Sequence, residues 1–252
     1  MIMVEKIDVE GIPSLHIADD QIASQKLPFV IFIHGFTSAK ENNLHYAYLL
    51  AEKGIRVLLP EALFHGERHG NIHASELPFH FWDIVINTIE ELSVIKEFFE
   101  KRNLIDVRRI GLAGTSMGGI VTLGALTKYD WIQSAVSLMG LPSYNLYARY
   151  QIEEMEKSGI DLPVSEDEKH ALLEKLKQYD LSLQPEKLMN RPLLFWHGKL
   201  DQVVPFSYSY QFYEKIKNEN KQIQFISDQK AGHQVSRNGL LSTIKWFETH
   251  LK

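Results

Sequence analysis

The sequence predicts a doubly wound α/β fold built around a mostly parallel sheet. The first observation is a series of short, continuous apolar runs, at residues 29–33, 55–59, 110–113, 135–139, 193–196 and 223–226. Runs without polar alternation are typical of strands that are covered on both faces. The second observation is that segments of helical period separate most of these runs. Alternating strands and helices favour a parallel sheet with right-handed crossovers.

The chain begins differently, with an antiparallel hairpin. Residues 4–9 and 14–17 alternate around Gly11, as the strands of a hairpin do. The helical segments follow from residue 44 onward. The first of them ends at Gly54, a residue type that commonly terminates helices. By apolar spacing we expect helices at residues 44–53, 83–101, 117–128, 206–217 and 238–251.

One long stretch, residues 141–190, contains no convincing strand. Its charged segments, 151–158 and 166–179, are compatible with two amphipathic helices. An insertion at the sheet edge where ligands bind would cover the site as a cap. The alternative is an ordinary solvated connection, although long loops without structure of their own are uncommon. We therefore expect an α/β core at residues 1–140 and 191–252 and a helical cap insertion at 141–190.

The composition excludes several classes of protein. The chain has 252 residues, enough to bury a core without disulfides, and a formal net charge of −5. It has no cysteine, which excludes a disulfide framework, a thiolate zinc site and a cysteine nucleophile. No block rich in lysine and arginine indicates nucleic-acid binding, and no apolar run is long enough to cross a membrane. We expect a cytoplasmic protein whose partner is a small molecule; its oligomeric state stays open.

The strongest local motif is Gly114-Thr115-Ser116-Met117-Gly118, which has the pattern G-x-S-x-G. The pattern alone is weak, because common residues produce it by chance. Here an apolar strand runs directly into it and a helical segment follows it. A sharp strand-to-helix turn of this kind lifts a serine hydroxyl out of the sheet. We therefore predict that Ser116 is a nucleophile; the alternative is a glycine-rich turn without chemistry.

A serine hydroxyl needs a base to take its proton. His233 is the best candidate, because it follows the strand at 223–226 in a short loop after a glycine. His197 also follows a strand, but the sequence around it suggests a role in a turn. His170 lies in the expected cap and His250 lies near the end of the chain. A lone histidine is more often structural than catalytic, and we interpret these three in that way.

The base in turn needs a buried carboxylate that holds its tautomer and stabilises the imidazolium. Asp201 follows the strand at 193–196, so it should lie on the same rim of the sheet as Ser116 and His233. Asp228 competes for this role, but it lies in the same loop as the histidine. The sequence therefore favours Asp201 as the acid.

The negative charge that develops on a reacting carbonyl oxygen needs backbone donors. Met117 N–H would be one donor, since it follows the nucleophile at the N-terminus of a helix. The second should come from the loop after an early strand, where Phe36 N–H is our assignment. Gly35 would allow the close approach of the backbone. His34 would hold the loop by hydrogen bonding and could border the substrate pocket.

A histidine-rich stretch follows the strand at 55–59. It could suggest a metal site, but Gly66 and Gly70 interrupt the helix that would align its histidines. We predict no metal and no cofactor, and we expect His65 to shape the substrate pocket instead. In the expected cap, Tyr144 and Tyr147 could line the same pocket. The candidate metal ligands in this stretch are His65, His69, His73, His80, Glu61, Glu67 and Glu76.

The segments FIHGF, GTSMGG, WHGKLDQVVP and AGH together resemble the α/β-hydrolase superfamily, over nearly the whole chain from about residue 29. More narrowly, the chain resembles small bacterial serine esterases of the prolyl-oligopeptidase-like and dienelactone-hydrolase-like group. The resemblance implies acyl hydrolysis without a cofactor, with Ser116, Asp201 and His233 as the triad and Phe36 and Met117 as oxyanion donors. Dienelactone hydrolases use a cysteine nucleophile and prolyl oligopeptidases carry a propeller domain, and this chain has neither.

Three possible functions are compatible with the motifs and with the family resemblance. The first is hydrolysis of carboxylic esters with small or medium acyl groups through an acyl-enzyme intermediate. The second is an amidase or peptidase with the same triad, since both reactions use the same groups. The third is a non-catalytic binding protein on the hydrolase fold, because a fold does not guarantee a function. The filled triad positions favour an enzyme.

Overall fold

The computed structural model describes residues 1–159 and 165–252. Its centre is an eight-stranded sheet with the order β1-β2-β4-β3-β5-β6-β7-β8. β1 (Ile2–Val9) and β2 (Ile12–Asp19) form the expected hairpin, and β2 pairs antiparallel with β4. All other neighbours are parallel, as the sequence predicts. The remaining strands are β3 (Leu27–Ile33), β4 (Arg56–Pro60), β5 (Ile105–Thr115), β6 (Ser134–Leu138), β7 (Leu193–Gly198) and β8 (Ile223–Asp228).

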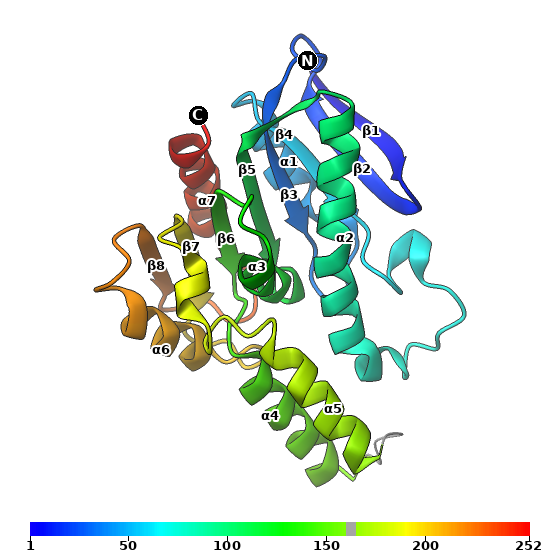
Figure 1. Ribbon diagram of the computed structural model, residues 1–252, viewed down its shortest axis with the longest axis vertical. Helices are drawn as coiled ribbons and strands as arrows, with labels where there is room; N and C mark the ends of the chain where they lie inside the picture. Colours follow the sequence, from blue (N-terminus) through cyan, green and yellow to red (C-terminus); the bar gives the residue numbers. More distant parts are fainter. Residues whose placement is uncertain (160–164) are drawn as a thin grey trace.

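Helices cover both faces of the sheet (Figure 1). α1 (Leu44–Ala51) and α7 (Arg237–His250) lie on one face. The other face is covered by α2 (Phe81–Lys101), α3 (Met117–Lys128) and α6 (Phe206–Ile216). Short 3-10 turns are found at η1 (Lys40–Asn43), η2 (Gly66–Arg68), η3 (Leu77–His80) and η4 (Pro185–Leu188).

The continuous apolar runs have the physical cause that the sequence suggests. In β3, Phe29, Ile31 and Ile33 face the α2–α3 side, while Val30 and Phe32 face the α1–α7 side. All of these residues have no exposed surface. Because side chains alternate across a strand, a strand buried on both faces must be apolar at every position.

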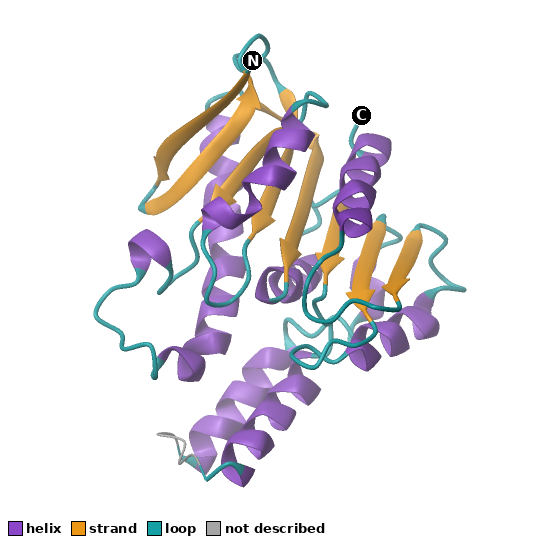
Figure 2. Cartoon of the chain, turned by 180° about the vertical axis from the view of Figure 1, so that it is seen from behind, coloured by secondary structure: helices purple, strands orange, loops and turns teal. Residues whose placement is uncertain are grey.

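Where the segment between β6 and β7 is described, at residues 139–159 and 165–192, it has two α-helices and no strand. α4 (Tyr144–Lys157) begins earlier than the charged segment that predicts it, and α5 (Glu166–Lys177) agrees with its prediction. Ser165 begins α5 with a capping box, in which its side chain accepts the N–H of Glu168 and the Glu168 carboxylate accepts the N–H of Ser165. Figures 1 and 2 show the α4–α5 pair projecting beyond the edge of the sheet at which the parallel strands end.

The arrangement brings together the loops that follow β3, β5, β7 and β8. These strands are parallel, so their carboxyl ends meet at one edge, which is where ligands bind in open α/β sheets. Among the described residues, the structure has no helix with the length and apolar character needed to span a bilayer.

Candidate active site

Ser116 lies at a strained turn between β5 and α3. Its φ of 53° and ψ of −115° are rare for a residue with a side chain. The turn is tight enough that a Cβ on Gly114 would lie 2.3 Å from the backbone of Gly118, and one on Gly118 would lie 2.1 Å from the carbonyl oxygen of Ile33. Glycine is therefore required at both positions, and the G-x-S-x-G pattern follows from the packing.

Three side chains from different loops form a continuous hydrogen-bonded chain. The Ser116 hydroxyl lies 2.8 Å from His233 Nε2. His233 Nδ1 lies 2.8 Å from Asp201 Oδ2. With the hydrogen on Nδ1, the histidine donates to the carboxylate and can accept a proton from the serine. The structure thus brings together the three residues that the sequence selects from loops after β5, β7 and β8.

Asp201 is held as a charged acceptor. Its Oδ1 accepts the backbone N–H groups of Val203 and Val204, at 2.9 and 3.0 Å. Burial would raise the pKa of this carboxyl, but hydrogen bonds from His197 and His233 outweigh it and keep the pKa well below the ordinary value. His197 Nε2 also contacts the carbonyl of Val204 at 2.9 Å. His197 therefore supports the acid loop, in agreement with a role in a turn.

Two backbone amides in the chain segments that meet at Ser116 have no acceptor in the described part of the chain. The N–H groups of Phe36 and Met117 donate to no acceptor in residues 1–159 or 165–252. Gly35 adjoins the serine, since a Cβ on it would lie 3.5 Å from Ser116 Cβ. The first N–H groups of a helix have no intrahelical acceptor, so Met117 N–H is free to bind an anion. The loop after β3, which adjoins Ser116 at Gly35, and the start of α3 thus each contain a backbone N–H without an acceptor among the described residues.

Comparison with known proteins agrees with this geometry. The sequence profile of the prolyl oligopeptidase family matches residues 86–252, which contain Ser116, Asp201 and His233. The chain belongs to the prolyl oligopeptidase family. It is 56% identical over 255 residues to "Putative esterase YitV" of Bacillus subtilis, with all of both chains covered. It is also 27% identical to "Esterase YjfP" of Escherichia coli, again over the full length of both.

Solved structures show the same fold. TT1662 from Thermus thermophilus superposes with a TM-score of 0.78 at 21% identity, covering 100% of this chain and 99% of that one. The acylaminoacyl peptidase of Pyrococcus horikoshii gives a TM-score of 0.68 at 20% identity, but only 42% of that chain is covered. At these identities the likeness shows the α/β-hydrolase fold alone. With the family match and the esterase relatives, it identifies the chain as a serine hydrolase.

Three of the four predicted pocket residues are buried and do not line an open pocket. The expectation that they border the substrate pocket is therefore corrected. His34 and Tyr144 have no exposed surface, and His65 is 3% exposed. The Tyr144 hydroxyl donates to the carbonyl of Ile120, and its ring packs against Gly124, where a Cβ would lie 2.1 Å from the hydroxyl oxygen. Tyr144 therefore anchors α4 to the core. His34 begins the loop that carries Phe36, and His65 packs against the Phe36 ring.

Tyr147, the fourth predicted pocket residue, is 6% exposed and contacts the loop that carries the acid. Its hydroxyl donates to the carbonyl of Val203, at 3.2 Å, and Val203 N–H donates to Asp201. Its ring contacts Phe81 and Tyr208 with centroids 6.5 and 6.2 Å apart. The helix α4 is thus attached to the loop that carries the acid.

An apolar crevice lies between the start of α2 and the α4–α5 pair. Phe81, Trp82, Met155 and Leu172 contribute to its lining. Trp82 Nε1 donates to the side chain of Gln151 across it, at 2.9 Å. Phe81 also packs edge-on against Phe36, with ring centroids 5.4 Å apart. The crevice therefore adjoins the loop that carries the free Phe36 amide. The sequence does not predict this crevice, because the walls of the crevice come from elements distant in the chain.

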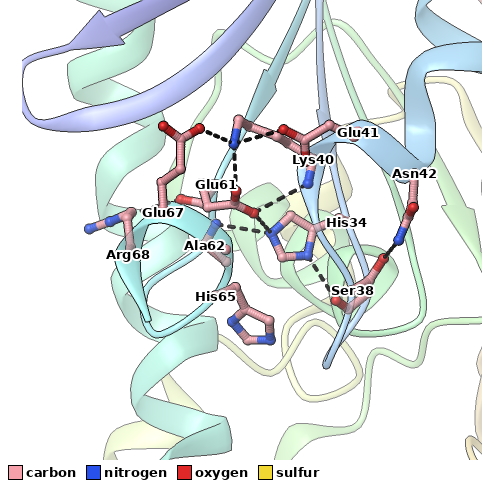
Figure 3. Close-up of polar contacts among 12 residues, drawn as sticks. His34, Ser38, Lys40, Glu41, Asn42, Glu61, Ala62, His65, Glu67 and Arg68 are labelled. Atoms are coloured by element: carbon pink, nitrogen blue, oxygen red, sulfur yellow. Dashed lines mark hydrogen bonds and ion pairs between the residues drawn. The ribbon is translucent and has the colours of Figure 1, made fainter. Parts of the chain in front are cut away.

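The histidine-rich stretch does not assemble a group of ligands. His69 and His73 are exposed, and His80 lies 3.5 Å from Asp83. In the described part of the chain, the acidic and histidine side chains whose ligand atoms converge are Glu41, Glu61 and Glu67. The ammonium group of Lys40 occupies the centre of that group (Figure 3).

The competing residues Asp228, His170 and His250 have other contacts or environments. Asp228 accepts the backbone N–H groups of Lys230 and Ala231, which stabilises its own loop. His170 is exposed on α5. His250 packs on Trp246, with ring centroids 4.3 Å apart.

Proposed function

We propose that this protein hydrolyses carboxylic esters of small or medium acyl groups, with Ser116 as nucleophile, His233 as base and Asp201 as the orienting acid. The observation that carries the proposal is the hydrogen-bonded chain of these three side chains beside the free amides of Phe36 and Met117. Nucleophile, base, orienting group and oxyanion donors are the complete set that acyl transfer needs.

The proposed reaction uses each of these groups in turn. His233 Nε2 takes the proton of the Ser116 hydroxyl as Oγ attacks the carbonyl carbon of the ester. The carbonyl oxygen becomes negative and accepts the N–H groups of Phe36 and Met117. The intermediate then collapses to an acyl-serine, and His233 returns its proton to the leaving alcohol. Water repeats the sequence: His233 deprotonates it, it attacks the acyl-serine, and the acid and free Ser116 are released.

Two observations support an ester rather than an amide substrate. The relatives that match over their full length have esterase names. Two of the peptidase-named matches, "Uncharacterized peptidase YuxL" and the acylaminoacyl peptidase, are covered over only 35% and 42% of their length. The apolar crevice beside Phe81 also suits an acyl chain, whose carbonyl would bind at Phe36 N–H while its tail extends past the Phe81 ring.

We also propose that residues 141–190 act as the cap of the site. The support is the contact of Tyr147 with Val203 and the position of α4 and α5 along the crevice. Because a crevice wall contributed by the cap would contact only longer acyl chains, the cap would set selectivity through differences in transition-state binding.

A substrate panel tests the function directly. p-Nitrophenyl esters of increasing acyl length are assayed beside aminoacyl p-nitroanilides, with Ser116→Ala as the matched control. We expect ester turnover, with kcat/KM rising as the chain enters the crevice, and loss of turnover in the control. A higher kcat/KM for the anilides than for any ester would support the amidase alternative and overturn ester specificity.

A further inference from the structure

A buried group of charges lies behind the loop that carries the Phe36 amide, and the proposed chemistry does not use it. The side chains of Lys40 and Glu61 are 1% and 0% exposed. The Lys40 ammonium lies 2.7 Å from Glu61 Oε2 and 2.7 Å from Glu67 Oε1 (Figure 3). Removing two charges from water has a high free-energy cost, so a buried pair of this kind needs a structural or functional reason.

The group joins two loops that follow neighbouring strands. Residues 34–40, after β3, are here called the oxyanion loop, and residues 61–68, after β4, the support loop. Ala62 N–H donates to His34 Nε2 at 3.0 Å, which also lies 3.2 Å from Glu61 Oε1. Lys40 N–H donates to Glu61 Oε1 at 3.2 Å. The support loop therefore holds the oxyanion loop at its first and last residues.

A further tether lies beside the free amide itself. Thr37 N–H donates to His65 Nε2 at 3.0 Å, and His65 Nδ1 lies 2.8 Å from the carbonyl of Leu63. This pattern requires a neutral ring with its hydrogen on Nδ1, and burial lowers the pKa of His65 accordingly. The ring of His65 also packs edge-on against Phe36, with centroids 5.5 Å apart.

Both loops contain a strained residue. Thr37 has a φ of 59° and Phe64 a φ of 61°, in the left-handed region that side chains disfavour. Such conformations persist only where the surroundings hold them. The approach of the loops is also tight, because a Cβ on Gly66 would lie 2.1 Å from Glu61 Oε2. Without its tethers, Thr37 would relax to a commoner φ, and the neighbouring Phe36 amide would turn with it.

We propose that Glu61, paired with Lys40 and adjoining His34, is a positioning residue that holds the oxyanion loop so that Phe36 N–H points at the carbonyl oxygen of the substrate. This inference rests on the proposed function. Burial would raise the pKa of Glu61, but its contact with His34 and the hydrogen bonds donated by Lys40 outweigh burial and hold the pKa at about 2. The carboxylate is therefore charged throughout the pH range of ester hydrolysis.

The test uses Glu61→Gln with Glu67→Gln as its matched control. Both carboxylates contact the same ammonium, but among the described residues only Glu61 also accepts the Lys40 amide. Each oxygen of Glu61 accepts from a donor, so the NH2 group of a glutamine would face a donor in either orientation. We expect kcat to fall about 10–100-fold with KM within about twofold, because oxyanion donors act mainly in the transition state. Glu67→Gln should stay within about twofold of wild type.

The readouts separate positioning from stability. kcat is expressed per serine titrated to completion with a fluorophosphonate, so unfolded protein is not counted. The inhibition constant of an alkyl trifluoromethyl ketone, whose adduct places an oxyanion at the Phe36 amide, should rise by the same factor as kcat/KM falls. If Glu61→Gln does not fold, Lys40→Met/Glu61→Leu removes the tether without leaving a buried unpaired charge. It should show the same loss.

The outcomes distinguish the inference from the function on which it rests. Unchanged kcat per titrated site and unchanged ketone affinity in the folded variants would overturn the positioning role, even if their melting temperatures fall. An equal loss of kcat in Glu67→Gln would also overturn the positioning role of Glu61, because the effect would then follow from losing either carboxylate beside the Lys40 ammonium. Retained ester turnover in Ser116→Ala would instead overturn the proposed function.

Discussion

Replacing Asp201 by asparagine should disable the site, although the two side chains have nearly the same size and shape. Asp201 Oδ1 accepts two backbone N–H groups, from Val203 and Val204. The asparagine oxygen must take that position, which directs its NH2 group at His233 Nδ1. The ring is then forced into the tautomer with its hydrogen on Nε2, and that hydrogen faces the Ser116 hydroxyl. In this tautomer His233 cannot accept the serine proton.

The expected loss is large because a wrong tautomer removes the base altogether. A comparable substitution in another serine hydrolase lowers kcat by about 10⁴, which corresponds to roughly 5 kcal/mol in activation free energy. We expect the same order for Asp201→Asn, with KM nearly unchanged. The assay is steady-state turnover of a p-nitrophenyl ester by protein purified from a host without background esterase.

Asp228→Asn is the matched control, because this second aspartate also accepts two backbone N–H groups in a rim loop. It should keep kcat within about threefold, as expected for a surface change away from the chemistry. A loss below about tenfold in Asp201→Asn, or a larger loss in Asp228→Asn, would refute the assignment of the acid.

Three further predictions concern the proposed cap and the buried charges. Tyr147→Ala should change the ratio of kcat/KM between long and short acyl esters; an unchanged ratio would count against the cap as a selectivity element. Tyr144→Ala should lower the free energy of unfolding by about 3–5 kcal/mol and leave that ratio unchanged. The folded pKa of Glu61 is about 2 and its ordinary value is 4.5. The ionised Glu61 therefore contributes about 3 kcal/mol to the free energy of unfolding. This contribution is complete above pH 4.5 and is lost as the pH falls toward 2. Denaturant titrations should show this loss in wild type and a smaller one in Glu61→Gln.

Much of this architecture could be predicted because its causes are local. The strand in β3 is recognisable because burial on both faces demands apolar residues throughout. Ser116 is recognisable because its turn requires glycine at 114 and 118. Asp201 and His233 follow from one further fact, that loops after parallel strands meet at the same edge.

The remaining features depend on packing between distant segments. The direction of Tyr144 is decided by Gly124 on α3, where the absence of a side chain leaves room for the ring. The pairing of Lys40 with Glu61 depends on the register of β3 beside β4, and a charged residue after a strand gives no indication of its partner. The position of Glu61 directly after the buried strand β4 was the one available signal for a buried carboxylate.

The most direct test of the account is covalent labelling of the serine. Wild-type protein is treated with an alkyl fluorophosphonate and its intact mass is measured, followed by mapping of the labelled peptide. We predict one adduct per chain, on Ser116, formed in step with the loss of ester turnover. Ser116→Ala should take up no label and should have lost most turnover. Undiminished labelling or turnover in the Ser116→Ala protein would contradict the account.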